Sequence, residues 1–212
     1  MTPETLREAI REHPILFSTP MIQALLAGKK TQTRRVVKLR KGDTVGNISS
    51  GGKIEEYIIC DKDGDEVPFE FTCPYGSIGD RLWVRETWAD GLDASTMKHF
   101  AVYKASHGLL PGQKWRPSIF MPRWASRITL EITGVKVERV QEISGQDVIA
   151  EGVDYKDIWG SFSTPDYDAF LDAQEKIAVE AYQELWDKIN GKRGYRWDTN
   201  PYIWAIEFKV IK

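Results

Sequence analysis

Stretches with the composition of β-strands recur along this chain, and only short helical patterns separate them. A strand is predicted over residues 80–88, where successive side chains alternate between two faces. Further strands are predicted over residues 101–104, 127–140 and 202–210; the second is expected to bend at Gly134, and the third is apolar at nearly every position. Because a parallel doubly wound sheet needs a helix after each strand, this order favours a mixed barrel. We therefore predict an α+β fold in one domain of 212 residues.

A short helix with both ends marked precedes the most unusual part of the sequence. Thr19 is a good N-cap, and Pro20 suits the first helical position. Apolar residues then recur at helical spacing, and Gly28 suits the left-handed conformation that ends a helix. The direction of the chain is therefore fixed just before residues 29–41.

Residues 29–41 hold seven basic side chains and no acidic one, namely Lys29, Lys30, Arg34, Arg35, Lys38, Arg40 and Lys41. The formal net charge of the whole chain is −2, so this cluster is a local feature. A solvated basic face is one interpretation, because most charge runs are of that kind. Thr33 and Val36 favour β structure, however, so we expect an ordered strand rather than a disordered basic tail.

Two segments are predicted to be insertions on the domain. Residues 42–66 are rich in Gly, Ser and Asp, and strand-like stretches at 55–59 and 67–72 predict a hairpin there. Residues 153–180 form the second insertion. It leads into a helix with a clear apolar face, which is expected to end at residues 190–191.

Short helices are predicted to flank the strands. The first fourteen residues have an amphipathic pattern that Pro14 would end. Ser144 and Asp147 form a capping-box pattern, which predicts a short helix over residues 145–151. Gly152 follows directly and is expected to stop that helix.

Four motifs occur in order along the chain: Gly28-x-Lys30-x-x-x-x-Arg35, residues 79–88, residues 121–127 and residues 200–208. Together they resemble the ASCH domain family, and in particular its longer members from bacteria and their phages. The resemblance extends from about residue 15 to the C-terminus. It implies a PUA-like mixed β-barrel associated with RNA, with short flanking helices and the two insertions.

The resemblance also implies a catalytic set. Compact ASCH proteins hydrolyse the amide of N4-acetylcytidine with a lysine, a threonine and a glutamate, which fall by motif on Lys30, Thr33 and Glu151. A lysine that acts as base or nucleophile must lose its proton, and nearby cations and burial would lower its pKa. Lys30 and Thr33 have opposite strand parity, so the chain must turn between them if both face one pocket.

Glu151 falls at the last turn of the predicted helix, where a carboxylate meets the negative end of the helix dipole. That placement suits a general acid–base role, and an exposed, hydrated glutamate is the alternative.

The predicted substrate-binding residues are Lys29, Arg34, Arg35, Glu86, Trp88, Arg123, Trp124 and Arg127. Glu86 and Trp88 share one strand face, where an acid and an indole would suit a nucleobase; barrel packing is the alternative for Trp88. Arg123 and Arg127 flank Trp124 and could follow a phosphate backbone. For Arg35 the alternative is a structural ion pair, with Glu86 or Glu207.

The expected partner is RNA or a modified nucleoside. A non-catalytic RNA-binding module and a single-stranded-RNA ribonuclease remain alternatives to the hydrolase. We expect no cofactor and no metal site, since Cys60, Cys73 and the three histidines lack ligand spacing. The two cysteines, the charged N-terminus and the lack of a long apolar run predict a soluble cytoplasmic protein with no membrane partner.

Overall fold

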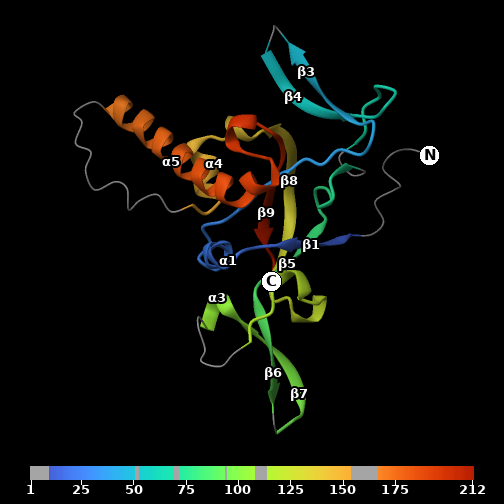
Figure 1. The fold of residues 1–212 in the computed structure, drawn as a ribbon, viewed down its shortest axis with the longest axis vertical. Helices are drawn as coiled ribbons and strands as arrows, with labels where there is room; N and C mark the ends of the chain where they lie inside the picture. The colour runs from blue at the N-terminus through green and yellow to red at the C-terminus, as the bar shows by residue number, and fades with distance from the viewer. Residues whose placement is uncertain (1–9, 51–52, 69–71, 94, 108–113, 154–166) are drawn as a thin grey trace.

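A five-stranded mixed sheet forms the centre of the protein in the computed structural model, which describes residues 10–50, 53–68, 72–93, 95–107, 114–153 and 167–212 (Figure 1). In spatial order its strands are β1 (Glu12–Leu16), β5 (Arg81–Arg85), β8 (Thr129–Arg139), β9 (Tyr202–Val210) and β2 (Gln32–Val36). The β1–β5 pair is parallel and the other pairs are antiparallel. The α+β class is confirmed. No sheet in the described residues closes on itself, so the finer description as a barrel is not established.

The long strand β8 bends where the sequence predicted. Its pairing with β9 shifts register between Ile132 and Gly134, which places a bulge in the middle of the strand. Strand β9 has the bounds expected for it and is buried on both sides. Ile203 faces one hydrophobic cluster, whereas Ile206 and Phe208 face another.

Two hairpins extend from opposite ends of the sheet (Figure 1). One pairs β3 (Thr44–Ser50) with β4 (Lys53–Cys60), and the other pairs β6 (Trp88–Asp93) with β7 (Lys98–Tyr103). The sequence predicted that residues 67–72 would form the second strand of the first hairpin. This prediction is wrong for residues 67–68, which are not in a strand, and residues 69–71 lie outside the described part.

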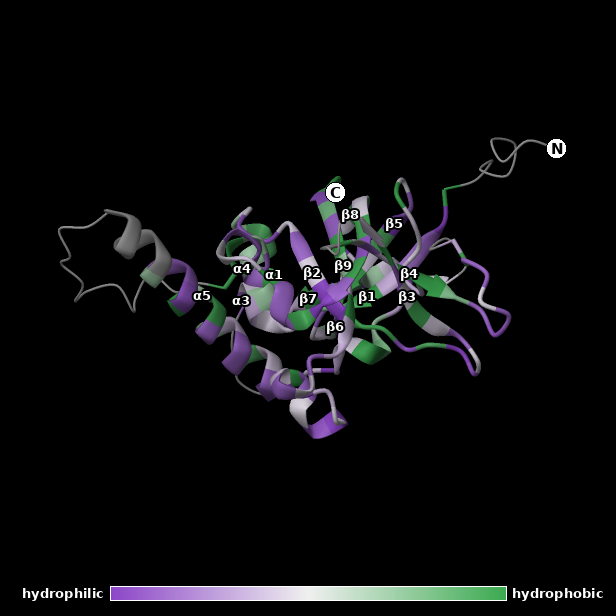
Figure 2. Cartoon of the chain, turned by 90° about the horizontal axis from the view of Figure 1, so that it is seen from above, coloured by the Kyte–Doolittle hydropathy of each residue, from purple (hydrophilic) through white to green (hydrophobic). Residues whose placement is uncertain are grey.

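The helices lie beside the sheet. They are α1 (Thr19–Leu26), α3 (Lys104–His107), α4 (Gly145–Ala150) and α5 (Tyr167–Asn190). Short 3-10 turns lie in the connections, namely η2 (Ser118–Phe120), η3 (Arg123–Ala125), η4 (Val140–Glu142), η6 (Gly191–Arg193) and η7 (Trp197–Thr199). Helix α5 packs on α4 and covers one face of β9. Hydrophilic and hydrophobic residues alternate along α5, as expected for a helix with one buried face (Figure 2). Among the described helices, none is long and apolar enough to cross a bilayer.

Three sequence predictions need correction. Residues 12–14 belong to the edge strand β1 and not to a helix, since an edge strand tolerates Pro14; residues 1–9 lie outside the described part. The N-cap of α1 is Ser18 rather than Thr19. The predicted strand over 80–88 is divided into β5 and β6.

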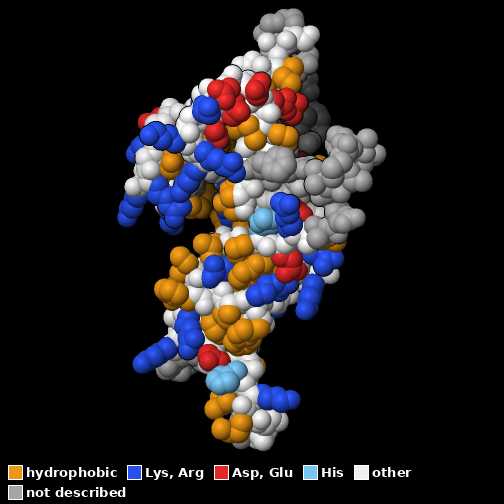
Figure 3. All heavy atoms as spheres, turned by 90° about the vertical axis from the view of Figure 1, so that its right-hand side faces the viewer, with side chains coloured by type: hydrophobic (Ala, Val, Ile, Leu, Met, Phe, Trp, Pro, Cys, Tyr) orange, Lys and Arg blue, Asp and Glu red, His pale blue; other side chains and the backbone are white. Residues whose placement is uncertain are grey.

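Hydrophobic side chains gather on the surface over the lower half of the molecule, where the β6–β7 hairpin lies (Figure 3). The exposed ones near this hairpin and η2 include Leu92, Phe100, Ile119 and Phe120, each about half exposed or more.

Gly152 ends α4 at the point where that helix meets α1. Its φ is +79°, and an added Cβ would lie 2.7 Å from Ala24 Cβ and 3.0 Å from Lys30 Cβ. Gly152→Ala should lower the free energy of unfolding by about 2–4 kcal/mol, because backbone strain and overpacking add. Gly28→Ala is the control, since Gly28 has φ +68° but no atom within 4 Å of its added Cβ among the described residues. Equal losses in the two variants on urea unfolding would contradict the packing argument.

Candidate functional site

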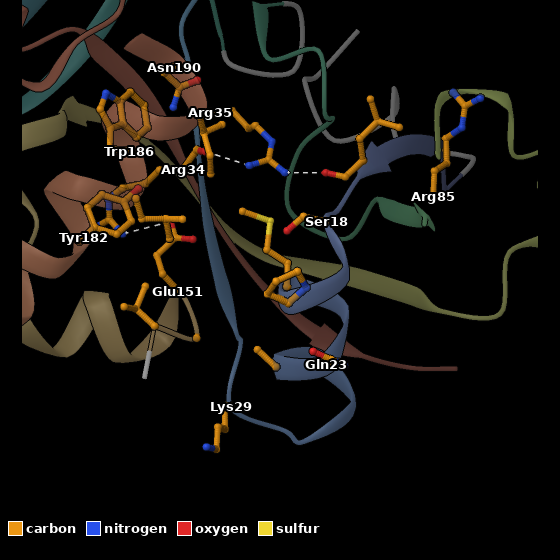
Figure 4. A pocket seen from close by; sticks show the side chains of 18 of the residues that line it. Ser18, Gln23, Lys29, Arg34, Arg35, Arg85, Glu151, Tyr182, Trp186 and Asn190 are labelled. Carbon is orange, nitrogen blue, oxygen red and sulfur yellow. Dashed lines mark hydrogen bonds and ion pairs between the residues drawn. The ribbon is translucent and has the colours of Figure 1, made fainter. Parts of the chain in front are cut away.

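A cavity of about 930 Å³ opens between α1, the first part of β2, the end of α4 and the last turns of α5 (Figure 4). Its volume lies within the range of small-molecule sites in proteins. The wall is mixed in character: aromatic residues from α5, an acid from the end of α4, and cations from β2 and η6. The residues that line it include Ser18, Arg34, Arg35, Tyr75, Glu151, Tyr182, Trp186 and Arg193.

Lys30 is buried behind this cavity. The backbone N–H of Thr31 donates to Ala150 O at 2.8 Å, which fixes the segment after Gly28 against the end of α4. Lys30 Nζ donates to Glu151 Oε2 at 2.7 Å, to Glu151 O at 2.8 Å and to Gln32 O at 2.8 Å. The three ammonium protons thus have three acceptors, and only 1% of the residue is exposed. Lys30 precedes β2, so strand parity does not apply to it.

The pKa of Lys30 lies below its ordinary value of 10.5, mainly because burial disfavours the charged form. The carboxylate of Glu151 opposes this change, and the Arg35 and Arg34 guanidinium groups add to it only weakly. The direction agrees with the sequence prediction, but burial rather than neighbouring cations is the main cause.

Glu151 lies at the C-cap of α4 and is 7% exposed. Oε2 is held by Lys30, whereas Oε1 lies 3.6 Å from Arg34 Nη1 and has no hydrogen-bond partner within the described part of the chain. Because a buried carboxylate oxygen normally accepts a hydrogen bond, this atom is left unsatisfied in a residue that lines the cavity. The structure therefore brings together two of the three predicted catalytic residues, and Glu151 is the one that reaches the cavity.

Arg34 is 3% exposed and is held by two carboxylates. Its Nη2 lies 2.7 Å from Glu138 Oε1 and 3.1 Å from Asp147 Oδ2, and Nη1 donates to Gln32 Oε1 at 2.7 Å. Lys30 and Arg34 are thus buried, and the basic segment is not simply a solvated face. Lys29, by contrast, is exposed, and its side chain points away from Glu151 (Figure 4).

Arg35 connects β2 to β1 at the far edge of the sheet. Its Nη2 donates to Leu16 O at 2.9 Å, and Nη1 donates to Thr33 Oγ1 at 3.0 Å and to Arg34 O at 3.1 Å. Thr33 is fully buried and does not line the cavity. The expected alternatives for Arg35, ion pairs with Glu86 or Glu207, do not form among the described residues, and Glu86 pairs with Arg127.

Glu86 and Trp88 lie away from the cavity. Glu86 accepts two hydrogen bonds from Arg127, at 2.8 Å and 3.0 Å, and Trp88 packs edge-on against Trp124 at 5.7 Å between ring centroids. Both are 2% exposed and neither lines the cavity, so these side chains do not contribute to a nucleobase pocket there. Arg123 pairs with Glu12 at 2.8 Å, and Trp124 remains 59% exposed. The structure therefore does not bring these five predicted binding residues to Glu151.

The aromatic residues Tyr182 and Trp186 of α5 pack in a hydrophobic core cluster, as their apolar face predicted, and they also line the cavity. Tyr182 lies beside Glu151 (Figure 4), and Trp186 packs on Tyr182 with 6.3 Å between their ring centroids. The periodic apolar face of α5 was the signal that placed them inside. The sequence carried no sign that part of this face borders a cavity.

Asp147 ties α4 to Arg34. Burial opposes ionisation of this carboxyl, but the Arg34 guanidinium and the hydrogen bonds from Ser144 outweigh it and lower the pKa of Asp147 below its ordinary 3.8. The folded protein therefore holds this proton less tightly than the unfolded chain does. The resulting stabilisation is fully present above the unfolded pKa and is lost as pH falls through the lower folded pKa.

We expect Asp147→Asn to flatten the dependence of unfolding free energy on pH below about pH 5. Urea unfolding at a series of pH values measures this slope. Asp198→Asn is the matched control, because the Asp198 side chain is 70% exposed. A slope in Asp147→Asn as steep as in the wild type would contradict the assignment.

Within the described residues, no group of three or more His, Cys, Asp or Glu side chains is placed to hold a metal ion. Comparison of the chain with protein-family models, with curated proteins and with solved structures finds no match. Assignment of the site therefore depends on its own geometry, on the buried Lys30–Glu151 pair and on the cavity beside it.

Proposed function

We propose that the protein is an ASCH-type, PUA-like hydrolase that removes an acyl group from the exocyclic nitrogen of a modified nucleoside such as N4-acetylcytidine. One observation carries the proposal: Glu151 lines the cavity and is fixed by Lys30 through Oε2, while its buried Oε1 has no hydrogen-bond partner among the described residues. A general base needs this arrangement, with one oxygen free to take a proton and the carboxyl group held in place.

The proposed reaction follows from the positions of the groups. The base of the nucleoside lies against Tyr182 and Trp186, with its acylated nitrogen near Glu151. Glu151 Oε1 takes a proton from a water molecule as the water oxygen adds to the acyl carbon. The carbon–nitrogen bond then breaks, the proton passes from Glu151 to the leaving nitrogen, and acetate and cytidine are released. Lys30 acts as a positioning residue, since its three protons are occupied by protein acceptors.

Thr33 has an indirect part in this scheme. Its hydroxyl accepts from Arg35, and Arg35 lines the cavity, so Thr33 helps to orient a side chain that can contact the substrate. The cations on the cavity wall are also the observation that favours the second candidate, an RNA-binding module without turnover.

The test is to incubate the protein with N4-acetylcytidine and, separately, with end-labelled single-stranded RNA. Equal amounts of cytidine and acetate are expected. Intact nucleoside together with shortened RNA would replace the hydrolase with a ribonuclease. Neither product, with RNA retention that weakens as salt is raised, would leave the binding module.

A further inference from the structure

The two arginines that β2 contributes to the cavity wall differ in how their charge is balanced. Arg34 is neutralised by Glu138 and Asp147. Arg35 donates to a hydroxyl and two carbonyl oxygens, and it makes no ion pair with a carboxylate among the described residues. Its guanidinium group is therefore held in a fixed orientation while its positive charge is not neutralised by a neighbour. Such a group is suited to bind an anion.

A second guanidinium group and a phenol hydroxyl belong to residues that line the same cavity, namely Arg193 and Tyr75. Burial raises the pKa of Tyr75, and the charges of Arg35 and Arg193 both oppose that rise. Arg193 belongs to η6, and its exposed side chain lines the cavity. Arg35, Arg193 and the neutral hydroxyl of Tyr75 thus supply two cations and a hydrogen-bond donor to the wall of one cavity.

The start of α1 adds to this wall. Ser18 is the N-cap residue, lines the cavity and makes no side-chain capping bond. In Figure 4 its hydroxyl lies on the same side of the cavity as the guanidinium group of Arg35. The N-terminal end of a helix carries partial positive charge, which also favours an anion.

Glu151 contributes a negative charge to the cavity, opposite in sign to the cations of Arg35 and Arg193. Its Oε1 is a buried acceptor without a hydrogen-bond partner in the described chain, on the side of the cavity that Tyr182 lines. A ligand that matches both the Glu151 carboxylate and the cations of the wall has an N–H donor on a flat ring and a negative charge at its other end. The cavity volume is near the upper limit for small-molecule sites, so it has room for both groups.

We infer that the cavity binds a phosphorylated nucleoside, with the base beside Glu151 and a phosphomonoester between Arg35, Arg193 and Ser18. The identity of the base rests on the proposed function, whereas the phosphate site does not require hydrolysis.

Calorimetric titration with cytidine 5′-monophosphate and with cytidine tests the phosphate site directly. The wild type should bind the monophosphate at least about 10-fold more tightly, since one charge-assisted contact of about 1.4 kcal/mol gives that factor. Arg193→Gln should reduce this ratio to near one. Lys192→Gln, which removes the same charge from an exposed neighbour that does not line the cavity, should retain it.

Inorganic phosphate gives a measurement that does not depend on a variant. It should compete with the monophosphate and not with cytidine, with competition that weakens as salt is raised. Equal wild-type affinity for the two ligands would overturn the inference. So would tighter binding of an oligoribonucleotide that lacks a 5′-phosphate, because the site would then accept a backbone phosphodiester.

Hydrolysis assays separate this inference from the proposed function. If neither N4-acetylcytidine nor its 5′-monophosphate is hydrolysed but the binding preference persists, the hydrolase is wrong and the phosphate site stands. If both are hydrolysed with equal kcat/KM and bound equally, the hydrolase stands and the phosphate site is wrong.

Discussion

Glu151→Gln should lower kcat/KM for N4-acetylcytidine by about 10²–10⁴-fold, the usual contribution of a positioned general base. The amide has the same shape and can still accept from Lys30, but it cannot take a proton from water. Release of cytidine, followed by chromatography under single-turnover conditions, measures the chemical step. We expect the loss in kcat rather than in KM, because the substitution removes an interaction of the transition state.

Glu184→Gln is the matched control for this variant. Glu184 is exposed on α5, two residues from Tyr182, and does not line the cavity. It removes one negative charge from the same region, so unchanged kinetics would exclude a general electrostatic effect. A rate within a fewfold of wild type in Glu151→Gln, with the fold intact by circular dichroism, would show that Glu151 is not the base.

The parts of the fold that the sequence predicted are those with local signals. The helix α1 ends at Leu26, and Gly28, two residues later, has the expected positive φ. The capping box of α4 forms as predicted, with Ser144 and Asp147 each bonded to the other. The strands β8 and β9 also follow their patterns, because both faces of β9 are covered and its apolar run reflects this directly.

Segments that depend on long-range contacts were harder to predict. Alternation continues past Arg85 in the sequence, but Glu86 leaves the sheet to pair with Arg127, and a new hairpin begins at Trp88. Strand parity predicted a shared face for Glu86 and Trp88, but the strand is interrupted between them. Parity cannot say whether that face meets solvent, a cavity or packed neighbours, and here both side chains are buried against neighbours.

The candidate site shows the same limit. Lys30 and Glu151 are 121 residues apart, and no local pattern joins them. Their contact depends on α4 ending at a glycine, since a side chain at Gly152 would meet Ala24 and Lys30. The pair was expected only from the family resemblance. Lys30 is covered by its acceptors, and of the two residues only Glu151 reaches the cavity. This difference arises from the packing of α1 on the end of α4, which the sequence alone did not reveal.

Lys30→Met should lower the free energy of unfolding by about 3 kcal/mol, which is the lower end of the range for removing one partner of a buried ion pair. The substitution leaves the Glu151 carboxylate buried with one hydrogen-bond donor fewer. We expect a loss of stability at the lower end of the range because Arg34 Nη1 remains 3.6 Å from Glu151 Oε1 and still partly balances its charge. Urea unfolding at neutral pH measures it, with Lys29→Met as the exposed neighbouring control.

Lys30→Met/Glu151→Gln should be more stable than Lys30→Met alone, to within about 1 kcal/mol of the wild type. The lowered pKa of Lys30 indicates that burial of its ammonium is itself unfavourable. The double substitution loses the attraction between the two charges, but it also removes the desolvation penalty of each of them. The four proteins form a double-mutant cycle whose coupling energy isolates the Lys30–Glu151 interaction. A coupling energy near zero would mean that the two charges do not depend on each other, and Lys30 would then have no means of positioning Glu151.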